Sequence, residues 1–150
     1  MLKKLQGYAY KGINTSELVD SKGNPRFVEG DGVPLEQEGF TSAYCKWSLS
    51  GSHLMCVLAG TIENTTVITA GTVLASFELP DYIKDKIVAV WQTYLAYVSQ
   101  SSYASDGTSQ NITVFIEKTS SGLRLLKSGT LTLSANRSFR IQVDLLIDSE

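Results

Sequence analysis

Alternation of apolar and polar side chains is the clearest pattern in this chain, and it is sharpest near the carboxyl end. Between residues 139 and 148, apolar residues occupy every second position, and mostly charged or polar residues stand between them. The apolar set is Phe139, Ile141, Val143, Leu145 and Ile147. Because successive side chains of a β-strand point to opposite faces, this period of two predicts a strand with one buried and one solvated face.

The same alternation predicts a β-hairpin over residues 43–58. Apolar residues alternate over 43–49 and again over 54–58, and Ser50-Gly51 suits a two-residue turn between them. The resulting register pairs Leu49 with Ser52, Trp47 with Leu54, and Cys45 with Cys56. A disulfide between directly opposite strand positions is strained, so we expect two buried free thiols.

Five further apolar stretches predict the remaining strands. They cover residues 73–79, 87–98, 112–116, 123–125 and 131–135. Pro80 ends the first stretch because proline has no N–H to donate to a strand ladder. About eight strands joined by short turns predict an all-β fold, an antiparallel β-sandwich or jelly-roll-like barrel, and not a parallel α/β sheet.

The beginning of the chain has a different texture. Turn-forming clusters occupy residues 22–25 and 29–32, and strong apolar periodicity is missing. We therefore expect residues 1–40 to form an extended lead-in or attachment segment, with one short strand around Phe27. Residues 41–150 are expected to form the β-domain.

Composition narrows the classes of partner. A chain of 150 residues is large enough to bury one core without metals or disulfides. The net charge is −2, the pI is about 5.4, and the basic residues are scattered, so nucleic acid is not an expected partner. No apolar run is long enough to predict membrane insertion, and no signal peptide is evident, so we expect synthesis in the cytoplasm of the producing cell. Patterns that bind phosphate, calcium or zinc are absent, and no cofactor or metal is expected.

Residues that would support catalysis are sparse. Nucleophilic catalysis usually needs a histidine base, and the single histidine, His53, falls in or beside the predicted hairpin turn. Glycoside hydrolysis needs a pair of carboxylates, and acidic residues cluster at Glu29, Asp31, Glu36 and Glu38. Acidic residues in a glycine-rich stretch are more often simply solvated. We expect no catalytic residues, and keep a polysaccharide hydrolase that uses these acids as a lesser alternative.

One segment has the composition of a binding loop. Residues 99–111 are rich in Ser, Tyr, Gly, Asn and Asp. Three aromatic residues, Trp91, Tyr94 and Tyr97, come shortly before this segment. Aromatic rings cover the apolar face of a sugar, and nearby carboxylates and amides bind its hydroxyls. The candidate saccharide-binding residues are Trp91, Tyr94, Tyr97, Tyr103, Asp106 and Asn111. The alternative interpretation is a solvated loop, with the aromatic residues in the core or at a subunit interface.

Three stretches resemble distal domains of bacteriophage tail and baseplate proteins. They are residues 44–54 (Tyr-Cys-Lys-Trp-Ser-Leu-Ser-Gly-Ser-His-Leu), residues 71–83 (Gly-Thr-Val-Leu-Ala-Ser-Phe-Glu-Leu-Pro-Asp-Tyr-Ile) and residues 136–142 (Asn-Arg-Ser-Phe-Arg-Ile-Gln). The chain is most similar to C-terminal head domains of receptor-binding proteins from phages of Gram-positive hosts. The likeness covers about residues 41–150 and lies in the layout of the strands.

The resemblance implies a β-barrel or jelly-roll head at the tip of the tail in the virion. It implies a homotrimer that contacts other tail or baseplate proteins and recognises a cell-wall saccharide of the host. It assigns no binding residue here, because such contacts vary between these proteins. The lead-in of this chain is shorter than the shoulder and neck of such proteins, so a structural accessory subunit of the baseplate, without glycan binding, remains the alternative.

Overall fold

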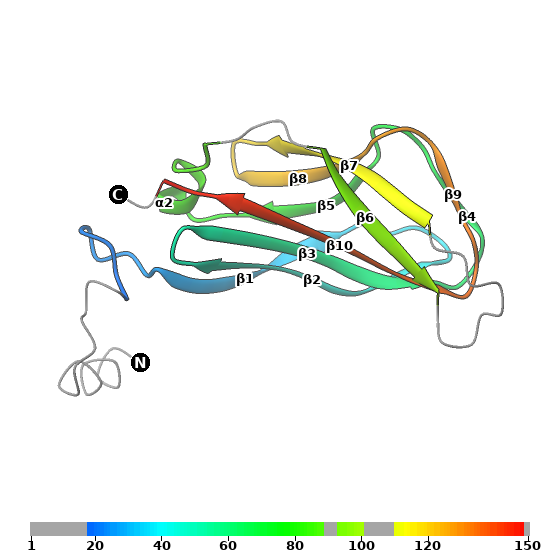
Figure 1. Ribbon diagram of the computed structural model, residues 1–150, viewed down its shortest axis with the longest axis horizontal. Coiled ribbons are helices and arrows are strands. Elements are labelled where there is room, and N and C mark those ends of the chain that lie inside the picture. Colours follow the sequence, from blue (N-terminus) through cyan, green and yellow to red (C-terminus); the bar gives the residue numbers. More distant parts are fainter. Residues whose placement is uncertain (1–17, 89–92, 101–109, 149–150) are drawn as a thin grey trace.

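The computed structural model describes residues 18–88, 93–100 and 110–148, of which 93–100 and 110–112 are described by their backbone alone. These residues form a closed antiparallel barrel with the strand order β1-β2-β3-β10-β6-β7-β8-β5 (Figure 1). The barrel strands are β1 (Phe27–Pro34), β2 (Phe40–Ser50), β3 (His53–Ile62), β5 (Val73–Glu78), β6 (Thr93–Gln100), β7 (Gln110–Lys118), β8 (Gly122–Lys127) and β10 (Arg137–Leu146). The expected all-β class is confirmed.

Two smaller elements complete the described fold. Strands β4 (Thr66–Ile68) and β9 (Leu131–Leu133) pair with each other in a separate sheet, and helix α2 (Asp81–Lys84) follows β5. Ile68 and Leu133 are buried and belong to the same hydrophobic cluster as the barrel interior. The β4–β9 sheet therefore covers part of the barrel core.

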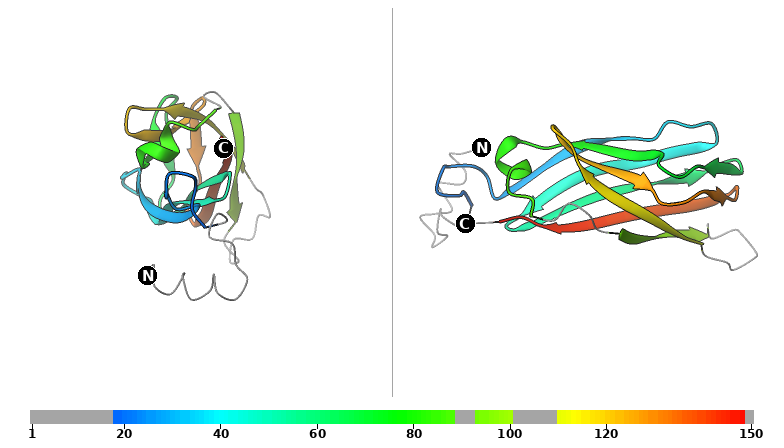
Figure 2. Two further views of the ribbon diagram at one scale, coloured as in Figure 1. Left: turned by 90° about the vertical axis from the view of Figure 1, so that its left-hand side faces the viewer. Right: turned by 90° about the horizontal axis from the view of Figure 1, so that it is seen from above.

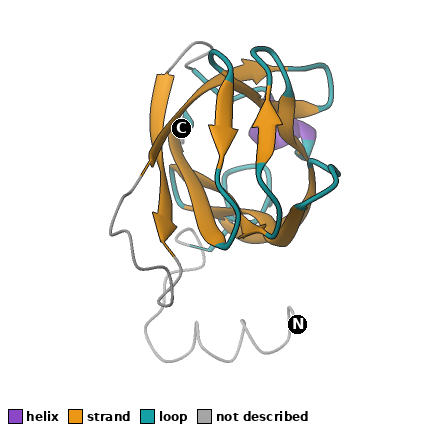
Figure 3. Ribbon diagram, turned by 90° about the vertical axis from the view of Figure 1, so that its right-hand side faces the viewer, coloured by secondary structure: helices purple, strands orange, loops and turns teal. Residues whose placement is uncertain are grey.

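The pairing of strands defines a distal end of the barrel. Phe40 lies opposite Ile62, Ile62 lies opposite Arg137, and Arg137 lies opposite Gln100. The β1–β2 connection leaves from this end, β6 ends here at Gln100, and β7 begins here at Gln110. Figure 3 views the barrel from this side.

The opposite, proximal end carries both ends of the described chain. The row of register partners at this end is Phe27, Ser50, His53 and Leu146. Residues 18–26 and helix α2 lie at this end (Figure 2). The backbone N–H of Asp148 donates to the carbonyl of Lys86 at 2.9 Å, which fixes the carboxyl end beside α2.

The core confirms the alternating pattern of the last strand. Along β10 the burial pattern alternates at every residue from Phe139 to Leu146, and Val143 has no exposed surface. The ring of Phe139 stacks on Phe40 of β2, with centroids 4.4 Å apart. Buried apolar residues of β2, β3, β5, β7, β8 and β10 meet in one cluster, and the half-buried Val28 of β1 packs against it. Burial of this surface is the main force that holds the barrel together.

Glycines inside the strands make room for aromatic rings. Gly30 lies opposite Trp47 in the β1–β2 pair, and a Cβ on Gly30 would come within 2.5 Å of the indole. Gly32 stands opposite Phe77 in the same way. A ring that packs over a glycine on the neighbouring strand fills the missing side-chain volume and pins the register.

This packing explains a wrong prediction about the domain boundary. We expected residues 1–40 to precede the β-domain, but β1 is a barrel strand that pairs with β2 through residues 27–31 and with β5 through residues 32–34. The Glu-Gly-Asp-Gly stretch at residues 29–32 is part of a strand and not a turn. Its glycines mark close contacts with aromatic rings, which local turn propensity does not reveal.

The expected register of the first hairpin is also wrong, because the two-residue turn lies one residue further along the chain than predicted. The turn is Gly51-Ser52, so Ser50 pairs with His53. Gly51 has φ +66°, a left-handed conformation that glycine adopts without steric cost and that tight hairpin turns require. The face of each residue is preserved, but Cys45 lies opposite Leu58 and not opposite Cys56. Both cysteines are free, as expected, with Cys56 buried and Cys45 half-buried.

The apolar stretch at residues 87–98 does not form one continuous strand. Ile87 makes an isolated bridge to Ile147, whereas β6 begins at Thr93. Residues 89–92 lie outside the described ranges. The helix before this stretch follows Pro80 and buries Ile83.

Candidate functional site

The candidate saccharide-binding residues are only partly within the described structure. Trp91, Tyr103 and Asp106 lie outside the described residues. Tyr94 and Tyr97 lie on β6 and Asn111 lies on β7. The register brings Tyr97 directly opposite Asn111, near the distal end of the β6–β7 pair. The binding role of all six residues stays a prediction.

A hollow of about 540 Å³ lies at the distal end, where β1 connects to β2. We call it the distal hollow; it is lined by Pro34, Leu35, Glu36, Gln37, Glu38, Phe40, Thr41 and Ser42. Its size falls within the range of roughly 300–1,000 Å³ that is typical of ligand sites. The sequence shows Glu36 and Glu38 as clustered acids, but no local pattern predicts a hollow at this connection.

Hydrogen bonds fold the distal hollow back onto β4. The side-chain amide of Gln37 donates to the carbonyl of Val67 at 3.2 Å, and the Thr66 hydroxyl is 3.2 Å from the carbonyl of Glu38. Gly39, which directly follows Glu38, has φ +79°, and a Cβ there would meet Asn64. A glycine at the end of a charged turn was the one local signal for this sharp reversal.

One polar atom of the distal hollow is buried without a partner. Among the described residues, Ser42 Oγ is the buried side-chain oxygen for which no hydrogen bond is present. Ser42 lies where the β2–β3 register shifts, at a β-bulge. Bulges reorient side chains beside binding sites, and a buried hydroxyl without a partner is unfavourable unless something else binds it.

The four acids of the hydrolase alternative do not share one location. Glu29 and Asp31 lie exposed on β1, and Asp31 pairs with Lys46 at 3.5 Å. Glu36 and Glu38 lie in the β1–β2 connection and are exposed to solvent. His53 is exposed at the first position of β3, at the proximal end and therefore far along the barrel from the distal hollow. A catalytic role for any of these residues stays untested.

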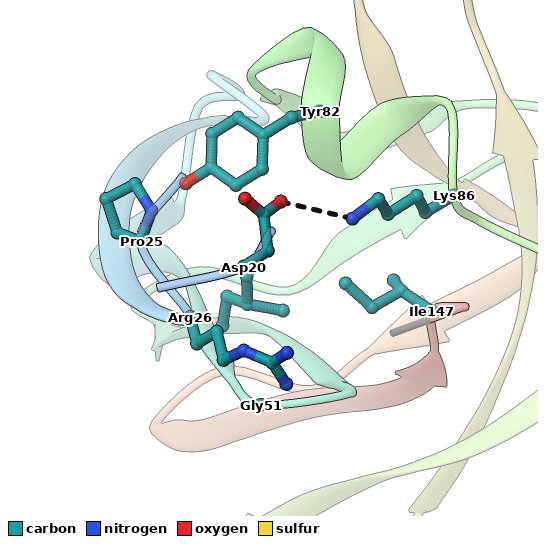
Figure 4. Close-up of a pocket in the computed structure, with 8 residues that line it drawn as sticks. Asp20, Pro25, Arg26, Gly51, Tyr82, Lys86 and Ile147 are labelled. Carbon is teal, nitrogen blue, oxygen red and sulfur yellow. Dashed lines mark hydrogen bonds and ion pairs between the residues drawn. The ribbon is translucent and has the colours of Figure 1, made fainter. Parts of the chain in front are cut away.

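A small cavity lies at the proximal end, beside the contacts that join Asp20 to Lys22, Asn24 and Lys86; we call these contacts the Asp20 clasp. The cavity has a volume of about 20 Å³ and is bordered by Asp20, Arg26, Tyr82 and Lys86, among others (Figure 4). This is room for about one water molecule. Figure 4 shows Asp20 and Lys86 pointing toward each other, with 3.3 Å between carboxylate and ammonium.

Asp20 is the centre of the clasp. Its carboxylate accepts hydrogen bonds from the side chain of Asn24 at 3.0 Å and from the backbone N–H groups of Asn24 and Lys22 at 2.8 and 2.9 Å. These bonds to Asn24 and Lys22, and the bond from Lys86, hold the pKa of Asp20 well below its usual value. The arrangement fixes the chain before β1 to the segment after α2.

Residues 18–88, 93–100 and 110–148 hold no cluster of three or more His, Cys, Asp or Glu side chains suited to a metal ion. No helix in the same ranges is long and apolar enough to cross a membrane.

No family model, no curated protein and no solved structure matches this chain.

Proposed function

We propose that this chain is a non-enzymatic attachment domain of a phage tail or baseplate, and that its distal end contacts a saccharide on the host cell surface. The observation that carries the proposal is that the two ends of the barrel carry different features. Both ends of the described chain and the Asp20 clasp lie at the proximal end. The distal hollow, the end of β6 at Gln100 and the start of β7 at Gln110 lie at the other end. A rigid scaffold that displays loops away from its attachment point is the usual layout of a binding domain.

The chemistry of the distal hollow supports a sugar as ligand. The half-buried Pro34 and Leu35 offer apolar surface, while Glu36 and Thr41 offer exposed acceptors and a donor. Ser42 Oγ adds a hydroxyl that has no partner among the described residues. A hexose presents an apolar C–H face and several hydroxyls, and so requires this mixture of groups.

The proximal end supports a second, protein partner. Phe27 at the start of β1, Leu146 at the end of β10 and Val88 after α2 are 57, 62 and 72% exposed. Large exposed apolar residues at one end of a domain mark a surface for protein contact. Under this proposal the proximal end docks on other tail or baseplate proteins. The domain assembles there as a homotrimer, which is one of the closed symmetric forms that oligomers adopt.

A retention assay tests the saccharide proposal. The intact protein should be retained on immobilised cell-wall polysaccharide from Gram-positive bacteria, and light scattering should give a trimer mass. A Tyr103→Ala and Asp106→Ala double variant should lose retention, whereas a Glu29→Gln and Asp31→Asn control on the outside of β1 should keep it. Absence of retention for the parent protein at high concentration overturns the proposal, and a monomer mass overturns the trimer.

The exposed proximal residues also favour a second candidate function, a structural accessory subunit that contacts only virion proteins. In that case the protein binds purified baseplate components through Phe27 and Leu146 but is not retained on any polysaccharide. The hydrolase alternative predicts instead that polysaccharide chains shorten on incubation, and that a Glu36→Gln and Glu38→Gln variant leaves them intact.

A further inference from the structure

A second hollow lies on the outer face of the β7–β8 pair. We call it the flank hollow; it is lined by Ala70, Gly71, Phe115, Glu117, Arg124, Leu126, Lys127, Ser128 and Gly129, and its volume is about 270 Å³. It shares no residue with the distal hollow or with the cavity of the Asp20 clasp. Because pockets for drug-sized ligands span roughly 300–1,000 Å³, this hollow suits a smaller ligand of about one ring.

The floor of the flank hollow is apolar and partly aromatic. Phe115 of β7 lies directly opposite Leu126 of β8, so both side chains emerge on the same face of the sheet. Phe115 is 39% exposed and Leu126 is half-buried. An aromatic side chain held in a strand, with part of its surface open, is a platform for an apolar ring face.

A charged pair forms the wall beside this floor. Glu117 and Arg124 are the next pair of directly opposite residues on the same face, and Arg124 Nε donates to Glu117 Oε2. The pair is partly open to solvent, with the two side chains 29 and 40% exposed. Only Nε of the guanidinium is engaged among the described residues, so its outer N–H groups remain as donors. The ion pair therefore offers donors and acceptors side by side, without net charge.

The far rim of the hollow is built from two turns. Gly71 and Gly129 have φ of +80° and +73°, and a Cβ at either position would meet no atom within 4 Å. The space above both turns is therefore open. The N–H of Gly71 donates to the carbonyl of Lys127 at 2.8 Å, and the N–H of Lys127 donates to the carbonyl of Thr72 at 2.9 Å.

Lys127 holds this rim in place and is not free to act as a ligand group. The residue is only 4% exposed, and its ammonium donates to the carbonyl of Ser128 and, at 3.5 Å, to that of Thr113. The hollow thus has a fixed rim at one side and a fixed ion pair at the other. Such preorganisation lowers the entropy that a bound ligand must lose.

We propose that the flank hollow is a second saccharide subsite, in which one neutral hexopyranose ring packs on Phe115 and its hydroxyls bind Arg124 and Glu117. The choice of a sugar rests on the proposed function, while the position and the neutral character come from the hollow itself. An acidic sugar is disfavoured, because Glu117 already neutralises Arg124. A long cell-surface polysaccharide that enters the distal hollow has further rings available for this second contact, which would add avidity.

Binding of neutral oligosaccharides by variants of the intact protein tests the subsite. The probes are arrayed oligosaccharides of glucose, galactose and N-acetylglucosamine. The oligosaccharide that the parent protein binds best is then titrated into the parent protein and each variant to measure their affinities. Phe115→Ala should weaken binding by about tenfold, and Phe115→Leu, which keeps the apolar volume but removes the ring, should weaken it to a similar degree. Arg124→Gln should also weaken binding. Tyr44→Ala, at an exposed aromatic residue of β2 that lines neither hollow, is the matched control and should leave affinity unchanged.

The possible results separate this inference from the proposed function. Unchanged affinity in both Phe115 variants overturns the subsite while saccharide attachment stands. Preference for glucuronic acid oligosaccharides, added to the array as the anionic set, over the neutral oligosaccharides also overturns it. Absence of binding to every probe and to cell-wall polysaccharide overturns both proposals. Thermal unfolding of each variant accompanies the titrations, and the Phe115→Leu result decides the matter if Phe115→Ala is destabilised.

Discussion

Gly30 lies directly under the indole of Trp47, and a Cβ at Gly30 would come within 2.6 Å of three atoms of that ring. The contact joins β1 to the rest of the barrel across the β1–β2 pair. It also accounts for a glycine in the middle of a strand, where this residue is otherwise unfavourable.

Gly30→Ala is expected to destabilise the barrel. The added methyl group forces the buried indole of Trp47 to shift, and overpacking of this kind costs about 1–3 kcal/mol. Urea unfolding monitored by tryptophan fluorescence measures the loss. Glu29→Ala, at the neighbouring outward position of β1, serves as the control and should change stability little. An unchanged free energy of unfolding in Gly30→Ala would show that Trp47 does not pack on β1.

Asp20→Asn is expected to loosen the proximal clasp at neutral pH. Because the pKa of Asp20 is lowered in the folded protein, its contribution to stability is complete above the usual aspartate pKa of about 4 and is lost as the pH falls further. The melting temperature of Asp20→Asn should lie below that of the parent protein at about pH 7 and converge with it in strong acid.

The control for the clasp is Asp31→Asn. Asp31 pairs with Lys46, but its side chain is 83% exposed, and exposed ion pairs contribute little. Its melting temperature should match that of the parent protein at every pH. An equal loss of stability in the two variants at neutral pH would contradict the special role of Asp20.

The two thiols should react slowly in the folded protein. Burial is the main factor that raises the pKa of Cys45 to about 11 and that of Cys56 to about 12. At about pH 8 few thiolates are present, so a disulfide reagent should label the native protein far more slowly than the unfolded one. Cys45, half-buried and with the lower pKa, should react first, and Cys45→Ser should abolish the faster phase. Rapid labelling of both thiols at that pH would contradict the packing of this hairpin.

Removal of two different hydroxyls at the distal end, those of Ser42 and Thr66, should have different effects on stability. Ser42→Ala removes a buried oxygen that has no partner among the described residues, so stability should stay equal or rise by up to about 1 kcal/mol. Thr66→Val removes the hydroxyl that bonds the carbonyl of Glu38, so stability should fall by about 1 kcal/mol. Chemical unfolding of both variants measures the difference. If Ser42 Oγ serves a ligand, Ser42→Ala also weakens retention on polysaccharide, and a fall in its stability would indicate a partner for Ser42 within the fold.

Local sequence patterns predicted most of the strands but not which strands pair to close the barrel. The buried positions of β10 followed directly from the alternation between Phe139 and Leu145, because a period of two admits a single orientation once one face is buried. The turn after Ser50 was misplaced by one residue, since Ser-Gly and Gly-Ser are both acceptable at a tight turn. Residues 29–32 were read as a turn because the rings that cover Gly30 and Gly32 belong to β2 and β5.

The candidate sites show the same division. The sequence pointed to a polar loop and to acids near Glu36, which are local compositional signals. The flank hollow needed the β7–β8 register, which places Phe115 opposite Leu126, and it needed Gly71, which comes from a distant segment of the chain.

The sequence by itself determined the all-β class, most of the strands and the face that each strand buries, because these depend on the spacing of apolar residues along a single segment. Tertiary structure alone decided that β1 closes the barrel, that the described ends of the chain share the proximal end, and where the hollows lie. Those features depend on contacts between segments far apart in the chain, and no local pattern specifies which strands become neighbours.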